Sequence, residues 1–341
     1  MKQRAWDEPG AEQVLDGVFR IPLPLPDDGL RAVNVYAISE GSSVTMIDAG
    51  WALAESLAAL ERGLAEAGHS LSDIEQFLVT HSHGDHYAQA ATVRRMFGSE
   101  VSIGAGERGS IEAMADPAFE PFSRIEQSLK RAGAEELLSD MLAWRRGARD
   151  KGPHVPWELP DRWLSAGTIS LKSRDLEVVD TPGHTAGHVV FHDLVAGVLF
   201  AGDHVLPRIT PSIGFEPGGA DLPLADFLDS QRVVLERPDA RLLPAHGPVT
   251  DSTHARAEEL IAHHEKRLDE TAAAVDSGAS TTYEVAQHLG WTRHERRLAE
   301  LDMFNQNLAI GETRAHLDVC VVRGWLDASE GTDGIVRYTR A

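Results

Sequence analysis

Cysteine is almost absent from this sequence of 341 residues, which contains Cys320 alone. One cysteine can form neither an intrachain disulfide nor a cluster of thiolate metal ligands, and this fits a reducing compartment. Long apolar runs are also missing, and the first ten residues, with Asp7 and Glu8, hold no apolar segment of a signal peptide. We therefore expect a cytoplasmic protein with no membrane partner.

Basic residues are scarce as well. The 32 Lys and Arg residues face 53 Asp and Glu residues, which gives a formal net charge of -21. Contact with several phosphates needs clustered Lys and Arg, so this balance argues against a nucleic-acid partner and favours a small-molecule substrate. The length suggests two or three domains, and 42% hydrophobic residues suffice for an ordinary core.

Histidine is concentrated in one short motif, His81-Ser82-His83-Gly84-Asp85-His86. The apolar residues 77–79 before it predict a buried strand, and the two-residue period of an extended chain places His81 and His83 on one face. Gly84 permits a turn into a helix predicted over 87–97, which displaces Asp85 and His86 toward a second ion. The motif therefore predicts two adjacent metal sites.

Three further candidate ligands follow predicted strands. His184 lies in a Pro-Gly turn after the apolar residues 176–179, and we expect it to join His81 and His83. Asp203 ends the apolar run 198–201, and His246 follows the apolar residues 242–243. Each of these side chains is therefore expected on a loop at the end of a strand.

With these motifs the chain resembles the metallo-β-lactamase superfamily over roughly residues 12–255. The resemblance implies an α/β fold, a four-layer αββα sandwich. It implies that Asp203 bridges two metal ions, that His188 supports the loop, and that Asp48 is a structural carboxylate beneath the metal loop. The implied ligands are His81, His83 and His184 for one ion and Asp85, His86 and His246 for the other.

Imidazole and carboxylate donors without thiolate suit zinc, although iron or manganese could occupy the same ligands. Two ions about 3.5–4 Å apart can share a hydroxide that attacks a carbonyl or phosphoryl group. Asp85 and Asp203 are candidate catalytic residues because they could orient that hydroxide or accept its proton. His204 could donate a proton to the leaving group, or it could simply pack in its loop.

A segment over about 105–165 interrupts the spacing between the motifs, and we interpret it as a helical cap inserted over the metal site. Residues 121–146 have helical periodicity. Trp144, Arg145 and Arg146 could bind an anionic substrate such as a coenzyme A thioester. Alternatively, they form an ordinary solvated helix face. Upstream, the alternating prolines of residues 21–26 predict an extended loop instead of a strand.

The tail, residues 262–341, predicts a small separate domain. Thr281 and Glu284 have the spacing of a capping box, helices are expected at about 296–308 and 311–325, and the end predicts a turn and a strand. This order resembles the winged-helix tail of the lactamase-like endoribonuclease branch. Because the tail has more acidic than basic residues, we expect a packing or homo-dimerisation module.

Three functions are compatible with these residues. Our main interpretation is hydrolysis of a carbonyl substrate by two metal ions, either a thioester or ester, as in acyl-coenzyme A or glyoxalase II-like chemistry, or a lactone. One alternative is a metal-dependent endoribonuclease, and another is a non-enzymatic regulator that senses a ligand and binds DNA. The superfamily hosts many reactions, so the fold alone cannot select the substrate.

Overall fold

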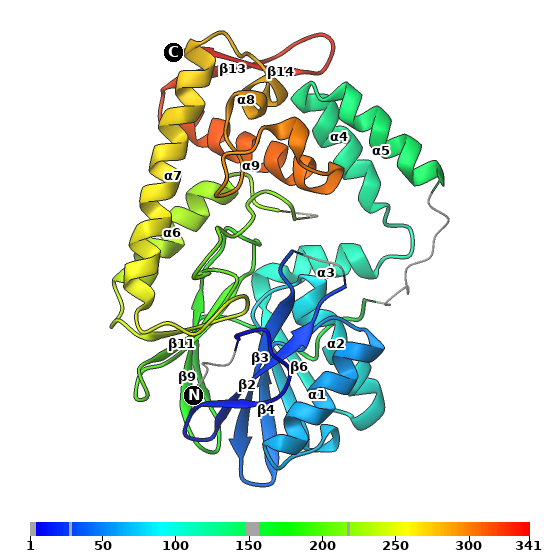
Figure 1. The fold of residues 1–341 in the computed structure, drawn as a ribbon, viewed down its shortest axis with the longest axis vertical. Helices are drawn as coiled ribbons and strands as arrows, with labels where there is room; N and C mark the ends of the chain where they lie inside the picture. Colours follow the sequence, from blue (N-terminus) through cyan, green and yellow to red (C-terminus); the bar gives the residue numbers. More distant parts are fainter. Residues whose placement is uncertain (1–4, 27–28, 148–156, 217–218) are drawn as a thin grey trace.

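The computed structural model describes residues 5–26, 29–147, 157–216 and 219–341 (Figure 1). Seven strands of the described chain form one sheet, with neighbours in sequence order. The first four are antiparallel and the later ones parallel. The strands are β1 (Glu12–Leu15), β2 (Val18–Pro24), β3 (Ala32–Glu40), β4 (Ser43–Ile47), β5 (Ile74–Val79), β6 (Glu100–Gly104) and β7 (Arg162–Leu164).

A second sheet packs face to face with the first. Within the described residues it has five strands in the order β12-β11-β10-β9-β8. Tyr36 and Phe200 meet edge-on between the sheets, with ring centroids 5.4 Å apart, and Ile38 and Phe191 are fully buried there. The strands are β8 (Gly167–Ser170), β9 (Asp175–Asp180), β10 (Val189–Asp193), β11 (Val198–Gly202) and β12 (Arg241–Pro244).

Helices cover the outer face of each sheet. Helices α1 (Ala54–Glu66) and α2 (Gly84–Phe97) bury Leu60 and Tyr87 against the first sheet. Helices α6 (Pro223–Leu235) and α7 (Thr253–Asp276) bury Phe227 and Leu260 against the second. The predicted α/β class, with sheets flanked by helices, is confirmed.

Between β6 and β7 the described residues contain the inserted helices α3 (Arg108–Ala115), α4 (Pro121–Ala132) and α5 (Glu135–Gly147). A glycine, Gly133, ends α4 in the left-handed conformation, with φ of 74°, and permits the turn into α5. Helix α4 packs against the C-terminal helix α9 (Met303–Val322), as Figure 1 shows. Of the cap predicted over 105–165, residues 148–156 lie outside the described residues.

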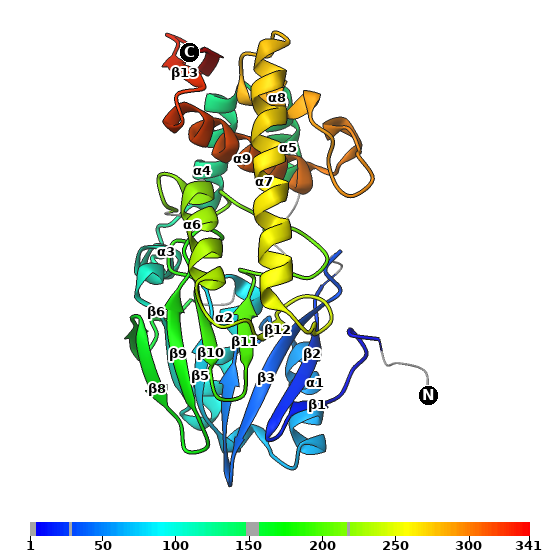
Figure 2. The ribbon, with the colours of Figure 1, turned by 90° about the vertical axis from the view of Figure 1, so that its left-hand side faces the viewer.

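The C-terminal region contains α8 (Thr282–His288), α9 and a hairpin of β13 (Leu326–Glu330) and β14 (Val336–Arg340). The predicted capping box is confirmed, because the Glu284 N–H donates to the Thr281 hydroxyl at 3.2 Å and the Glu284 carboxylate accepts from the Thr281 N–H at 3.0 Å. Figure 2 shows α7 running lengthwise from the sheets to this region. The winged-helix interpretation stays a prediction.

The two helices predicted over 296–308 and 311–325 are wrong, because α9 runs without interruption from Met303 to Val322. The misleading residue is Gly311, which suggested a boundary. In the structure a Cβ at this position would lie 3.3 Å from the backbone oxygen of Gly214. Gly311 therefore allows α9 to approach another segment closely.

The loop predicted for residues 21–26 is also wrong over most of its length. Residues 21–24 belong to β2, in which Pro22 pairs with Asn34 and Pro24 with Ala32 of β3. On its other side β2 pairs with β1 only as far as Arg20. Beyond Arg20 that side of β2 is a sheet edge. A proline is tolerated there because no neighbouring strand needs its N–H as a hydrogen-bond donor.

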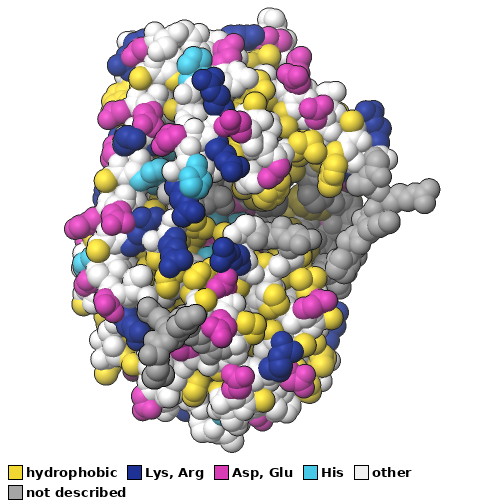
Figure 3. All heavy atoms as spheres, in the orientation of Figure 1, with side chains coloured by type: hydrophobic (Ala, Val, Ile, Leu, Met, Phe, Trp, Pro, Cys, Tyr) yellow, Lys and Arg dark blue, Asp and Glu magenta, His cyan; other side chains and the backbone are white. Residues whose placement is uncertain are grey.

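On the face shown in Figure 3, acidic side chains are scattered over the whole face, while several Lys and Arg side chains lie close together near its middle. None of the described helices is both long and apolar enough to span a membrane. The net negative charge is thus distributed over the visible surface and is not gathered in one patch there.

Candidate metal centre

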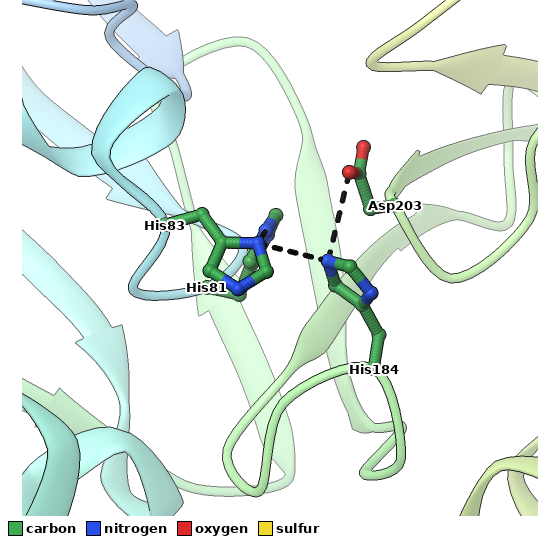
Figure 4. Close-up of side chains that lie close together, drawn as sticks. All are labelled: His81, His83, His184 and Asp203. Carbon is green, nitrogen blue, oxygen red and sulfur yellow. Dashed lines mark hydrogen bonds and ion pairs between the residues drawn. The ribbon is translucent and has the colours of Figure 1, made fainter. Parts of the chain in front are cut away.

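The sequence-predicted ligands converge at one edge of the two sheets. His81 follows β5 and His83 is the N-cap of α2, while Asp203 and His246 follow the parallel strands β11 and β12. Figure 4 shows His81, His83, His184 and Asp203 pointing toward one another. Because the carboxyl ends of these strands meet there, residues distant in sequence form one site.

Three imidazoles form the first half of the site. Nδ1 of His83 lies 3.0 Å from Nε2 of His81 and 3.0 Å from Nε2 of His184. Three ring nitrogens this close together compete for the same protons. Their convergence is the arrangement expected of three ligands to one cation.

The second half combines Asp85 with His86 and His246. The Asp85 Oδ2 atom lies 3.3 Å from Nε2 of His246 and 3.6 Å from Nε2 of His86. One donor atom from each of the three lies within 4.8 Å of the others. This half therefore offers two imidazoles and a carboxylate.

Asp203 lies between the two halves. Its Oδ2 atom is 3.6 Å from Nε2 of His184, whereas its Oδ1 atom is 3.4 Å from Nε2 of His246 and 3.6 Å from Nε2 of His86. One carboxylate thus presents one oxygen to each half. This is the placement that a bridging ligand requires.

Acceptors behind the histidines fix the orientation of their rings. Nδ1 of His86 donates to Asp48 at 2.8 Å, Nδ1 of His184 to the Ser212 carbonyl at 2.7 Å, and Nδ1 of His246 to the Ala32 carbonyl at 2.9 Å. Each ring therefore turns Nε2 toward the site. Asp48 also accepts from the Thr80 N–H at 2.8 Å, in agreement with its predicted structural role.

The donor atoms fit divalent cations. Nε2 of His86, Nε2 of His246 and Oδ1 of Asp203 are buried and have no hydrogen-bond partner among the described residues. Buried polar atoms are rarely left unpartnered, and these three face one another across the site. A pair of metal ions would satisfy them.

The pKa values separate the two halves. Burial and the neighbouring imidazoles hold the pKa of His83 to about 3 and lower that of His81, so the first half is uncharged at neutral pH. Burial opposes a charge on His86 too, but Asp85, Asp48 and Asp203 together raise its pKa to about 9. The second half is thus built to hold positive charge.

Two further histidines lie behind the ligands. Nε2 of His188 accepts a hydrogen bond from the Asp203 N–H at 3.2 Å, so His188 supports the loop, as the sequence suggested. His204 is fully buried, and its ring meets Phe227 edge-on with centroids 5.2 Å apart. This packing against Phe227 favours the packing alternative over proton donation.

A cavity of about 670 Å³ opens beside the first half of the centre. We call its side next to the centre the pocket floor; it is lined by Ser82, His83, Gly183, His184 and Ala186. The opposite side, which we call the pocket roof, comes from α4 and α9. It is lined by Arg124, Ile125, Gln127, Ser128, Arg131, Asn307, Leu308, Gly311 and Arg314.

The basic and aromatic residues proposed from the sequence lie elsewhere. Arg145 pairs with Glu120 at 2.7 Å and lies over the Phe122 ring, Trp144 is 62% exposed, and Arg146 is exposed in the last turn of α5. None of the three lines the pocket. The structure therefore does not bring them to the metal centre.

Sequence reasoning missed two neighbouring glutamates, the fully buried Glu107 and the partly buried Glu216. Glu107 accepts a hydrogen bond from the Thr185 hydroxyl, and Glu216 accepts from the Ser110 hydroxyl and from the Ala186 N–H, the latter at 2.6 Å. Burial and the Glu216 charge raise the pKa of Glu107 to about 7. The two glutamates thus bond the loop that carries His184, and Glu216 also bonds α3. The sequence signal of Glu107 is a carboxylate just beyond the end of β6.

Comparisons with known proteins agree with this architecture. The model of the Metallo-beta-lactamase superfamily matches residues 28–246, and the model named "Metallo-beta-lactamase-like, C-terminal domain" matches residues 268–341. The Probable metallo-hydrolase YqjP of Bacillus subtilis is 26% identical over 320 residues, which cover 88% of this chain and 90% of that protein.

Two other similarities are informative. A Hydroxyacylglutathione hydrolase of Cereibacter sphaeroides is 27% identical over 182 residues, covering 53% of this chain and 49% of that protein. The crystal structure of a metallo-beta-lactamase family protein from Thermus thermophilus superposes with a TM-score of 0.75 at 28% identity. The superposition covers 96% of this chain and 100% of that one.

Proposed function

Because the chain belongs to the metallo-beta-lactamase superfamily and is a metal-dependent hydrolase, we propose that it cleaves a small carbonyl substrate, a thioester or an ester, with lactones as a related class. The observation that carries this proposal is Asp203, whose two oxygens face the two halves of the centre beside a pocket large enough for such a substrate. The similarity to a hydroxyacylglutathione hydrolase supports the choice of carbonyl chemistry.

We assign the metal ligands as the sequence suggested. Bound there, two divalent ions would activate water at neutral pH and polarise the carbonyl oxygen, and the nitrogen and oxygen donors favour zinc. We assign to Asp85 and Asp203 the role of accepting a proton from the attacking water. The proposed ligands are His81, His83, His184 and Asp203 for one ion and Asp85, His86, His246 and Asp203 for the other.

Two arginines of the pocket roof favour an anionic substrate. Arg124 and Arg314 form no ion pair among the described residues, and Nε of Arg314 is buried without a hydrogen-bond partner there. Arginine binds carboxylate and phosphate groups in a bidentate manner. We propose that these two residues hold an acidic group of the substrate while its carbonyl lies on the pocket floor.

A comparative hydrolysis assay tests the proposal. The zinc-loaded protein is offered acyl-coenzyme A thioesters, hydroxyacylglutathione, lactones and single-stranded RNA, with Asp85→Ala as the control for contaminating hydrolases. We expect turnover of a thioester or ester that Asp85→Ala abolishes. Cleavage of RNA alone, also lost in Asp85→Ala, would contradict the carbonyl assignment.

The domain organisation is proposed on the same basis. We assign residues 12–255 to the catalytic domain and 262–341 to a C-terminal domain that packs on it or mediates homo-dimerisation. Support comes from the two family models, which match on either side of residues 247–267. Sedimentation of the intact protein at several concentrations checks the dimer.

A further inference from the structure

A second group of metal-binding side chains lies away from the centre, where α7 packs against α9. It consists of His263 and His264 on α7 and Glu312 on α9. One possible donor atom from each lies within 4.8 Å of the other two. The reaction proposed above uses none of these residues.

Hydrogen bonds fix the orientation of the buried histidine in this group. Nδ1 of His316 donates to the Glu312 carbonyl at 2.8 Å, so Nε2 of the neutral His316 ring is an acceptor. That nitrogen lies 3.1 Å from Nδ1 of His264, which must therefore be the donor. Nε2 of His264 is left with a lone pair, and it is buried with no partner among the described residues.

This arrangement is typical of a metal-binding histidine. Such a ring donates its remote N–H to a fixed acceptor and keeps the other nitrogen free for the ion. His264 is fully buried, so water does not compensate its free nitrogen. A buried acceptor without a donor is costly, and a cation would remove that cost.

The neighbouring groups supply the remaining ligands. Burial raises the pKa of Glu312, whose carboxylate forms no ion pair among the described residues; Arg267 is the nearby cation that opposes this rise. The His263 ring, 5.2 Å from that of His264 by centroid distance, is exposed and leaves the group accessible from solvent. Burial and Arg267 lower the pKa of His263, which keeps this imidazole uncharged at neutral pH.

We propose that His263, His264 and Glu312 form a third metal site, distinct from the catalytic centre, that binds a borderline divalent cation such as Zn²⁺. Two imidazoles and one carboxylate suit zinc, cobalt or nickel and do not suit calcium or magnesium, which prefer oxygen donors. The ion would join α7, which follows His246 in the chain, to α9 of the C-terminal region. It would therefore stabilise the packing of that region on the catalytic part.

Metal counting on the intact protein tests this site. The protein is freed of metal with a chelator, equilibrated with zinc chloride and analysed for bound zinc, alongside His263→Ala, Glu312→Gln and the control His288→Ala, which removes another exposed helical histidine. We expect wild type and His288→Ala to bind one more zinc per chain than the two site variants. Equal counts in all four proteins would overturn the proposal.

Thermal melting separates the site from the catalytic centre. Zinc should raise the melting temperature further in wild type and His288→Ala than in Glu312→Gln. Only the first two proteins retain all three ligands of the zinc ion that joins α7 to α9. Hydrolysis of the best substrate should be unchanged in His263→Ala, whose side chain is exposed and outside the pocket. An equal zinc-dependent rise in all variants would contradict the proposal even if the catalytic assignment held.

Discussion

The pocket floor and the pocket roof are built in opposite ways. On the floor, Nδ1 of His83 lies 3.0 Å from Nε2 of both His81 and His184, and Glu107 and Glu216 bond the loop that carries His184. On the roof, Arg124 is exposed and Nε of Arg314 has no partner among the described residues. The difference indicates that the floor fixes the chemistry, whereas the roof can change its contacts with the substrate without disturbing the metal centre.

The largest effect is expected from Asp203→Asn, which changes the residue that lies between the two halves of the metal centre. The amide keeps the size of the side chain but lacks the charge that both halves use. We expect hydrolysis to fall by about 1,000-fold or more, together with a lower zinc content, since carboxylate charge and ligation are lost together. Steady-state kinetics and elemental analysis measure both.

Asp193→Asn is the matched control for that substitution. Asp193 is also a buried carboxylate of the second sheet, but it pairs with Arg174 at 3.0 Å, away from the centre. It should lower stability while leaving the zinc content unchanged. Equal zinc loss in both variants would mean that the loss follows from removing any buried carboxylate charge, and not from the position of Asp203 between the two halves of the centre.

A smaller loss is expected when one ligand is removed from one half. His83→Ala and His246→Ala should each lower activity by roughly 100-fold. Removing a residue that only supports a metal ligand already lowers activity by about 10- to 100-fold, and removing the ligand itself should cost at least as much. The two variants should differ in their zinc content at low pH. In the metal-free protein the second half holds protons, with a pKa of about 9 at His86, so its zinc must displace them.

We therefore expect the zinc that survives in His83→Ala to be released as the pH falls, and the zinc that survives in His246→Ala to be retained to lower pH. Dialysis against zinc buffers over a pH series measures this. Identical release curves for the two variants would remove the distinction between the halves.

Glu107→Gln tests whether a protonated Glu107 stabilises the loop beside the pocket floor. Glu107 has a folded pKa of about 7, against 4.5 for an unperturbed glutamate, so the folded protein holds a proton that the unfolded chain releases between these values. Wild type should therefore lose stability as the pH rises through that window, on the order of 1–3 kcal/mol relative to Glu107→Gln, which cannot ionise.

Urea unfolding at about pH 5 and about pH 8 measures the difference. The control is Glu112→Gln, which alters an exposed carboxylate on α3. It should leave the pH dependence of stability unchanged. Parallel pH profiles for wild type and Glu107→Gln would show that the glutamate pair does not hold a proton in the folded state.

The same contrast explains what the sequence could predict. Four of the seven proposed ligands lie within residues 81–86, and the others follow apolar strands, so local patterns were enough to indicate the metal centre. The roof joins α4 to α9, two helices that lie far apart in the sequence, and no local pattern encodes that contact. Gly311 was misread for the same reason, because its partner, Gly214, is remote in sequence.

Long-range contacts also account for the wrong prediction at residues 21–26 and for the alternatives left open at Arg145. The prolines of β2 are tolerated only because β1 stops pairing at Arg20, which depends on the length of another strand. Arg145 and Arg131 are both basic residues of the insertion, but Arg131 lies on α4 and lines the pocket whereas Arg145 does not. Composition alone could not distinguish them.

The smallest effect is expected from the roof. Arg314→Met removes the guanidinium but keeps an apolar chain, and we expect KM for an anionic substrate to rise about three- to tenfold with kcat nearly unchanged, since a charged hydrogen bond is worth about 1.5–3 kcal/mol and part of it is replaced by water. A neutral substrate of the same acyl group should show no change. Arg145→Met, outside the pocket, should affect neither substrate. A fall in kcat for both substrates in Arg314→Met would show that the roof also shapes the metal centre, and the separation between floor and roof would fail.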